Sequence, residues 1–214
     1  MGAEGRALLL AGLLALLAGS VDAIGFLRLG HLFVAFMGGN TTTLSVAVAH
    51  GRWREAAQGG ALVVLFTAGA AAGGVLDEAT GRWHVPLILA LVAALLALAA
   101  GGWPALPVLL MALAMGALNV AIHRVGPASV GPSYVTGALG KLGEGFGLWV
   151  ADRAAGRGRE GLDWAIQGVL WLGLVASTAA GTGLVAGLGD GAPWVPAGAA
   201  LLLAGAAPIL HTPS

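Results

Sequence analysis

Long apolar runs fill most of this 214-residue chain, and they leave few folds open to it. Apolar residues make up 58% of the sequence and charged residues only 9%, whereas soluble domains carry about 25% charged residues. A soluble protein this apolar would expose large patches and aggregate, but lipid can solvate such a surface. We therefore expect an all-α polytopic membrane protein with the lipid bilayer as its main partner.

The runs divide into about eight candidate segments. A transmembrane helix needs about 20 mostly apolar residues, and such stretches occur at roughly 6–27, 32–50, 57–76, 85–102, 105–123, 131–150, 162–186 and 194–210. The second and sixth contain glycines and polar residues, so they are candidates for broken or re-entrant segments. Backbone can unwind at membrane depth only against protein or a water-filled cavity. Because every loop is short, we expect one integral membrane domain, 1–214.

A repeated motif divides the chain into two halves. One copy starts at Gly19 and the other at Gly116, and each places a polar residue, Asp22 or Asn119, three positions later in an apolar run. Each copy then reaches a break of glycine and threonine. A doubled pair of interrupted segments is typical of a transport site at a repeat interface. We predict two repeated halves, 1–103 and 104–214.

The relative orientation of the halves depends on the second and sixth segments. Eight full spans give parallel halves, whereas two re-entrant segments leave three spans in each half and an inverted repeat. Basic residues follow both weak segments, at Arg52, Arg54, Arg153, Arg157 and Arg159. Basic loops tend to stay cytoplasmic. We therefore expect parallel halves, with both termini on the cytoplasmic side of the membrane.

Asp22 is the residue that is most costly to place in a membrane. A carboxylate at the centre of a membrane helix costs about 2.5–3.5 kcal/mol on insertion scales, and such residues often mark ion or proton pathways. Asp22 is therefore a candidate coupling site. Alternatively, it forms a structural ion pair with Lys141, Arg28 or Arg124. The matching Asn119 keeps the hydrogen bonding and loses the charge.

A polar cluster interrupts the second segment at Gly38, Gly39, Asn40, Thr41 and Thr42. Glycines permit a backbone break, and a helix that restarted after Gly39 would offer free N–H groups to an anion or a substrate oxygen. The alternative is a glycine-packed helix crossing, with the threonines bonded to carbonyls of their own helix. The feature returns at Thr136 and Gly137, so we predict substrate binding at both breaks.

Other polar residues give weaker signals. Lys141 and Glu144 lie on one helical face and can form a local ion pair, while Glu144 as a second proton carrier is the alternative. The histidines lack metal-ligand spacing, and a chain without cysteine has no thiolate chemistry. Ser20, Ser133 and His123 form no recognisable nucleophile–base motif. We expect no enzyme, no metal and no cofactor.

Charge and small residues limit the partners. The formal net charge is zero, whereas a nucleic-acid-binding protein needs a basic surface. Glycine-rich helices can approach one another closely, which leaves a homodimer open. The run from Ala7 to Gly19 also has features of a signal peptide. The apolar pattern continues to Phe26, so we expect a retained helix.

The same residues resemble a known family. The stretches Asp22–Phe26 and Phe36–Thr42 are similar to the first signature of the YoaK-like small hydrophobic bacterial membrane proteins, a domain of unknown function. Met115–Asn119 and Tyr134–Gly137 resemble its second signature. The family usually has serine or threonine at the position of Gly38, and often glutamine at that of Leu118. The resemblance implies a multipass inner-membrane protein and supplies no established substrate.

Three functions are compatible with these residues. The first is a secondary transporter or permease for a small polar solute or ion, with a site between the halves lined by Asp22, Asn40, Thr41, Asn119 and Thr136. The second is a passive channel with the same lining. The third is an accessory or structural membrane subunit. Transport that requires a pH gradient would favour the first, and tolerance of apolar substitutions at Asp22 would favour the third.

Overall fold

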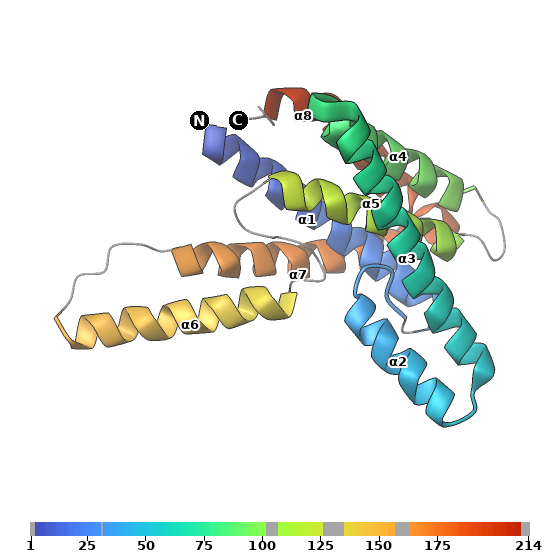
Figure 1. Cartoon of the computed structure of the whole chain (residues 1–214), viewed down its shortest axis with the longest axis horizontal. Coiled ribbons are helices and arrows are strands. Elements are labelled where there is room, and N and C mark those ends of the chain that lie inside the picture. Colours follow the sequence, from blue (N-terminus) through green and yellow to red (C-terminus); the bar gives the residue numbers. More distant parts are fainter. Residues whose placement is uncertain (1–2, 31, 102–106, 126–134, 157–162, 211–214) are drawn as a thin grey trace.

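The computed structural model describes residues 3–30, 32–101, 107–125, 135–156 and 163–210. Over these ranges the chain is almost entirely helical, with no β-strand (Figure 1), which confirms the expected all-α fold. The helices are α1 (Ala3–Arg28), α2 (Met37–Ala49), α3 (Trp53–Thr80), α4 (His84–Ala99), α5 (Pro107–Val125), α6 (Val135–Ala154), α7 (Asp163–Leu188) and α8 (Trp194–Leu210), with 3-10 turns η1 (Gly81–Trp83) and η3 (Gly189–Gly191).

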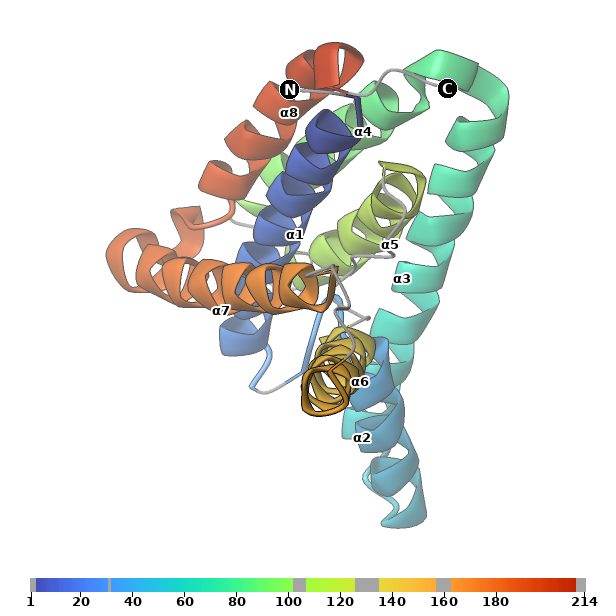
Figure 2. The same ribbon diagram turned by 90° about the vertical axis from the view of Figure 1, so that its left-hand side faces the viewer.

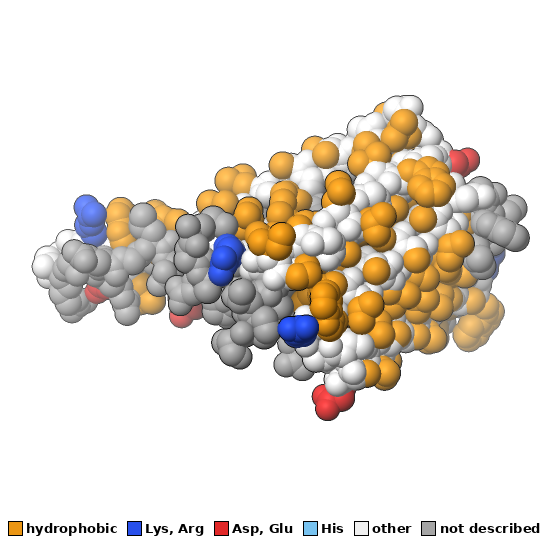
Figure 3. All heavy atoms as spheres, turned by 90° about the horizontal axis from the view of Figure 1, so that it is seen from above, with side chains coloured by type: hydrophobic (Ala, Val, Ile, Leu, Met, Phe, Trp, Pro, Cys, Tyr) orange, Lys and Arg blue, Asp and Glu red, His pale blue; other side chains and the backbone are white. Residues whose placement is uncertain are grey.

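Among the residues that the structure describes, three stretches are long and apolar enough to cross a membrane, and they are Leu8–Arg28, Trp53–Ala99 and Trp164–Gly191. The second contains both α3 and α4, and the apolar parts of α5 and α8 are shorter. Hydrophobic side chains are spread over the face in Figure 3, and large ones such as Leu202 are 77% exposed. Lipid solvates such a surface, and water does not. The protein is therefore an integral membrane protein.

The core lies where α1, α4, α5 and α8 meet. The buried face of α1 recurs every three or four residues, at Leu10, Leu14, Leu17, Val21 and Ile24. This spacing places the side chains on one stripe of the helix. Buried residues of α4 and α5, including Ile88, Leu96, Met111 and Leu118, complete the cluster. Asp22 follows Val21 directly and so lies at the edge of this packed stripe.

Two close crossings tie the helices together, one between α3 and α5 and the other between α1 and α7. A Cβ atom added to Gly69 or Gly116 would overlap the backbone of the facing helix. A Cβ atom added to Gly181 of α7 would lie 2.5 Å from the backbone oxygen of Ser20 in α1. Helices in lipid approach this closely where small residues meet. These glycines therefore set the geometry of both crossings.

Gly116→Ala is expected to destabilise the protein, because the new methyl group would overlap the backbone oxygen of Phe66. Overpacking of this kind costs about 1–3 kcal/mol, so melting in detergent should occur at a lower temperature. The matched control is Gly74→Ala in α3, where an added Cβ meets nothing within 4 Å. The control should melt no earlier than the parent, because alanine favours a helix over glycine by about 1 kcal/mol. Equal melting of the two variants would contradict the close crossing.

Helices that the predicted repeat would pair run in opposite directions. In Figures 1 and 2, α1 is antiparallel to α5 and α4 is antiparallel to α8, while the first turn of α1 and the last turn of α8 lie at the same end. The parallel halves that we expected from the basic loops are therefore not found. The opposite directions arise because α2 does not return across the molecule. It continues in the general direction of α1 (Figures 1 and 2).

The connection from α1 to α2 explains this direction. The chain doubles back after Gly30, so that Val34 packs beside Gly25 and α2 begins alongside α1 rather than beyond its end. α2 has 13 residues, which corresponds to about 20 Å of helix. A hydrocarbon core is about 30 Å thick, so α2 alone is too short to span it. The helix of the second segment is therefore shorter than a full membrane span.

Candidate functional site

Asp22 binds the backbone of the α1–α2 connection. Its Oδ1 accepts hydrogen bonds from the backbone N–H groups of Val34 at 2.9 Å and Ala35 at 2.8 Å. Both bonds end on the same oxygen, and within the described ranges no hydrogen bond reaches Oδ2. Asp22 is thus anchored through one oxygen while the other remains able to bind a proton or cation.

Asn40, on the first turn of α2, holds the same connection from the other side. Its side chain is fully buried. Its Oδ1 accepts from the backbone N–H of Phe33 at 2.9 Å, and its Nδ2 donates to the backbone oxygen of Phe33. We call residues Leu32–Phe36 the strap. Asp22 and Asn40 together bind three consecutive N–H groups of this strap, which are the groups that a helix would have satisfied internally.

Aromatic and glycine contacts seat the strap. The ring of Phe33 lies 4.9 Å from that of Phe26 and 5.3 Å from that of Phe36, measured between centroids. A Cβ added to Gly25 would lie 2.5 Å from a methyl group of Val34, and one added to Gly39 would lie 2.8 Å from the ring of Phe36. The two glycines therefore leave room for strap side chains.

The break is displaced from its predicted position. We expected the helix to restart after Gly39, but α2 begins at Met37, so Gly38 and Gly39 lie in its first turn. The irregular backbone instead precedes the glycines and is stabilised by the side chains of Asp22 and Asn40. The carboxylate of Asp22 binds the N–H groups of Val34 and Ala35, which precede α2 and not the residues after Gly39.

The threonines of α2 bond to their own helix. The hydroxyl groups of Thr41, Thr42 and Thr43 donate to the backbone oxygens four residues earlier, at 2.8, 3.1 and 3.0 Å. All three are exposed. This is the alternative arrangement for the cluster, and it does not bring Thr41 or Thr42 into the hydrogen-bond network of Asp22.

The second copy of the motif is described at Asn119, Thr136 and Gly137. Asn119 is half-buried on α5, and Thr136 and Gly137 lie in the first turn of α6. Ser133, and the side chains of His123 and Arg124, lie outside the described residues. The N-terminal ends of α2 and α6 lie near each other in both views (Figures 1 and 2).

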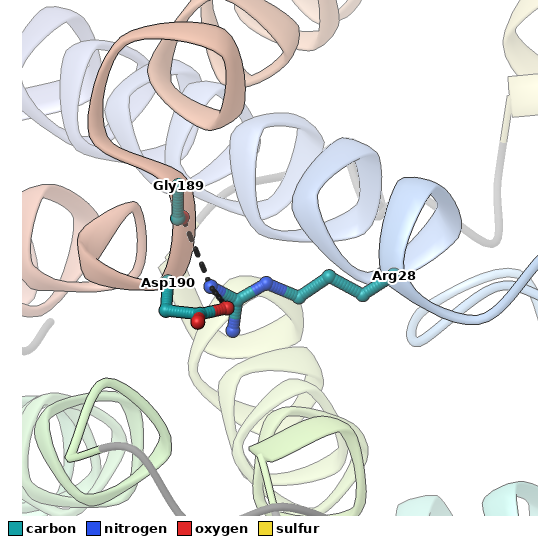
Figure 4. A network of polar contacts seen from close by, with 3 residues as sticks. All are labelled: Arg28, Gly189 and Asp190. Carbon is teal, nitrogen blue, oxygen red and sulfur yellow. Dashed lines mark hydrogen bonds and ion pairs between the residues drawn. The ribbon is translucent and has the colours of Figure 1, made fainter.

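Arg28 has a different partner from the one expected. Its Nη2 donates to the backbone oxygen of Gly189 at 3.0 Å and lies 3.5 Å from Oδ1 of Asp190, in the turn between α7 and α8 (Figure 4). Lys141 and Glu144 lie exposed on α6, and neither contacts the carboxylate of Asp22. Of the three ion pairs considered for Asp22, those with Arg28 and Lys141 are therefore not formed.

Two apolar clefts flank the crossing of α1 and α7. One, of about 570 Å³, is lined by residues of the N-terminal parts of both helices, including Leu8, Leu13 and Ile166. The other, of about 540 Å³, lies between α1, α7 and α8, and its polar side chains are Ser20 and Ser177. Both serine hydroxyls donate to carbonyls of their own helices. These clefts suit hydrocarbon better than a polar solute.

Sequence reasoning missed the role of the strap. Phe33, Val34 and Ala35 act through backbone groups, which carry no signal in a sequence. The aromatic spacing of Phe26, Phe33 and Phe36 was the one available hint.

Comparison with known proteins identifies a family and a relative. The model of a family described as "Protein of unknown function (DUF1275)" matches residues 10–206. UPF0700 transmembrane protein RA0705 of Rhizobium meliloti (strain 1021) is 42% identical over 193 residues, which cover 89% of this chain and 81% of the relative. No solved structure matches the chain. The matched span includes both copies of the motif.

Proposed function

This chain belongs to the DUF1275 family, as its motifs led us to expect, and we propose that it is a secondary transporter or permease for a small polar solute or ion in the bacterial inner membrane. The observation that carries the proposal is that the N-terminal ends of α2 and α6 lie near each other (Figures 1 and 2). Interrupted helices that meet near the bilayer midplane are typical of transporter sites.

We further propose that the halves form an inverted repeat, and the register of the crossings supports this. A Cβ added to Gly73 would meet Ala117 and Val120, whereas one added to Gly181 would meet Ser20 and Ala23. Ser20 stands after Gly19 as Ala117 stands after Gly116, and Ala23 follows Asp22 as Val120 follows Asn119. The two crossings therefore join equivalent positions.

The turns after the crossings support the same relation. Gly81 and Gly189 have φ angles of 50° and 52°, a region that favours glycine. Each begins a 3-10 turn, η1 or η3, and Gly81 follows Gly73 at the same spacing as Gly189 follows Gly181. With antiparallel partners, such a repeat has its two-fold axis in the membrane plane. Movement of one half against the other could then open the site to each side of the membrane in turn.

The chemistry of the site follows from its two unlike halves. Helix N-termini carry partial positive charge, which favours a solute with an electron-rich group. The carboxylate of Asp22 offsets part of this charge, and the neutral Asn119 does not. We assign proton or cation coupling to Oδ2 of Asp22, and solute contacts to Asn119, Thr136 and the backbone at the start of α6.

An inverted repeat changes the expected topology while keeping the termini cytoplasmic. It places the α2–α3 connection, with Arg52 and Arg54, on the side opposite to the α6–α7 connection. Arg28 lies on the same side as Arg52 and Arg54 in this topology. The other side then holds Arg6, Arg82, Arg124, Arg153, Arg157 and Arg159. Six arginines against three favour the second side, which also carries both termini, as cytoplasmic.

Single cysteines test this topology, because the chain has no native cysteine. In intact cells an impermeant thiol reagent should label Arg54→Cys and should not label Arg157→Cys. Permeabilised cells provide the control, since both sites should then react. Protection of both positions in intact cells would restore parallel halves and contradict the inverted repeat.

A further inference from the structure

We propose that the strap, Leu32–Phe36, is a lid that opens and closes over the first turn of α2, with Asp22 and Asn40 as its two latches. The purpose of the lid rests on the proposed transport function, but its motion can be measured without a substrate. The motif residues that we had expected to contact the solute would then act on the lid that admits it.

The backbone N–H groups of the strap are held by bonds to side chains, while Leu32, Val34 and Ala35 belong to the buried core. The N–H groups of Phe33, Val34 and Ala35 donate to side-chain oxygens of Asp22 and Asn40, and not to backbone oxygens of a helix or sheet. Backbone outside a helix at membrane depth must be satisfied by protein or water. Two of these bonds end on Oδ1 of Asp22, so loss of that single acceptor releases both together.

The apolar side of the strap suits closure. Val34 and Ala35 are buried, at 0% and 2% exposure, against α1. The ring of Phe33 packs against that of Phe26 on one side and against that of Phe36 on the other. Apolar constrictions exclude water and can gate a path by that means. The closed strap therefore excludes water from its contact with α1.

The ends of the strap provide hinges. Gly30, at φ 61°, ends the α1 side of the connection, and Gly38 and Gly39 follow on the α2 side. Hinges are a few positions at the ends of elements that absorb changes in backbone angles. Phe36 makes no side-chain capping bond at the start of α2. Two backbone bonds, from Met37 N to the oxygen of Ala35 at 3.2 Å and from Asn40 N to that of Phe36 at 3.4 Å, join the first turn to the strap.

A disulfide between Gly25→Cys and Val34→Cys tests the lid. A Cβ built at Gly25 lies 3.2 Å from Cβ of Val34, close to the separation of about 3.5–4.5 Å that disulfides require. Amide exchange of the peptide that contains Phe33, Val34 and Ala35 is measured in detergent, in the reduced and oxidised protein. We expect oxidation to slow this exchange by about tenfold or more, because local opening governs it. Equal exchange in both forms would overturn the lid.

Two single variants keep the test decisive if the disulfide distorts the fold. Asp22→Ala removes the acceptor and should speed exchange of the same peptide by about tenfold or more, since two bonds are lost. Asp22→Asn keeps an oxygen at the same position and should leave the exchange close to that of the parent. Equal exchange in Asp22→Ala and the parent would overturn the latch.

Uptake separates the lid from the transporter. If the chain transports a solute, oxidation of the double-cysteine variant should stop uptake and reduction should restore it. Unchanged uptake in the oxidised form would contradict a gating role. A strap that opens in a chain that moves no solute would instead leave the lid standing and remove the proposed function.

Discussion

Asp22→Asn should abolish gradient-driven uptake and leave the protein folded. In the described part of the chain, the carboxylate anchors the strap through Oδ1, and the asparagine side chain offers an acceptor oxygen in the same place. The variant loses only the negative charge and the second oxygen, on which we place the coupling proton or cation. Uptake into proteoliposomes under an imposed pH gradient should fall to the level of empty liposomes.

The matched control for this experiment is Asp190→Asn. Asp190 is a carboxylate at 99% exposure in the turn between α7 and α8, so its replacement should change neither uptake nor melting. Detergent melting of both variants checks the fold. If Asp22→Asn keeps the full response to the gradient, Asp22 is a structural latch only. If it unfolds, the charge itself holds the connection together.

Gly39→Leu should destabilise the protein strongly. A Cβ at this position would lie 2.8 Å from the ring of Phe36 and 3.2 Å from that of Phe33, and the leucine adds three further carbons. Both rings must move, which would disturb the strap and the hydrogen bonds between Asn40 and Phe33. Overpacking costs about 1–3 kcal/mol, and each buried polar group left unpaired costs about 1–3 kcal/mol more. Melting in detergent should therefore occur well below the parent temperature.

Gly38→Leu is the matched neighbour. Its Cβ would meet the ring of Phe36 at an ordinary 3.6 Å, and the position is exposed. This variant should melt close to the parent. Equal losses in the two variants would show that glycine matters here for the backbone and not for the packing of the strap. A Gly39→Leu variant as stable as the parent would contradict the seating of the strap.

The helices could be predicted from the sequence, but their connection could not. Each of the eight predicted segments overlaps one helix, although α2 is too short to span a bilayer. The position of the break was missed, since glycine at Gly38 and Gly39 suggested a local cause. The actual cause is the bonding of Asp22 to Val34 and Ala35, which lie twelve and thirteen residues further along the chain. Local composition carries no signal for a contact of that kind.

The predicted orientation of the halves differs from the observed helix directions for a related reason. The basic loops after α2 and α6 favoured a common side, which requires four spans in each half. That count assumed that α2 crosses the membrane, whereas its 13 residues are too few. The positions of Asp22 and Asn40 beside a helix start were predictable from the motif. Their common attachment to the strap required the three-dimensional structure.

The measurement that tests the proposed transporter most directly does not require the substrate to be identified beforehand. Proteoliposomes that contain the parent protein, Asp22→Asn or no protein are placed in a mixture of small metabolites and ions, with and without a pH gradient. Mass spectrometry and elemental analysis then identify what has entered the lumen. We expect at least one small polar solute or ion to accumulate with the parent protein, only under the gradient, and not with Asp22→Asn. Entry that is independent of the gradient would indicate a channel, and a lumen identical to that of empty liposomes would contradict transport.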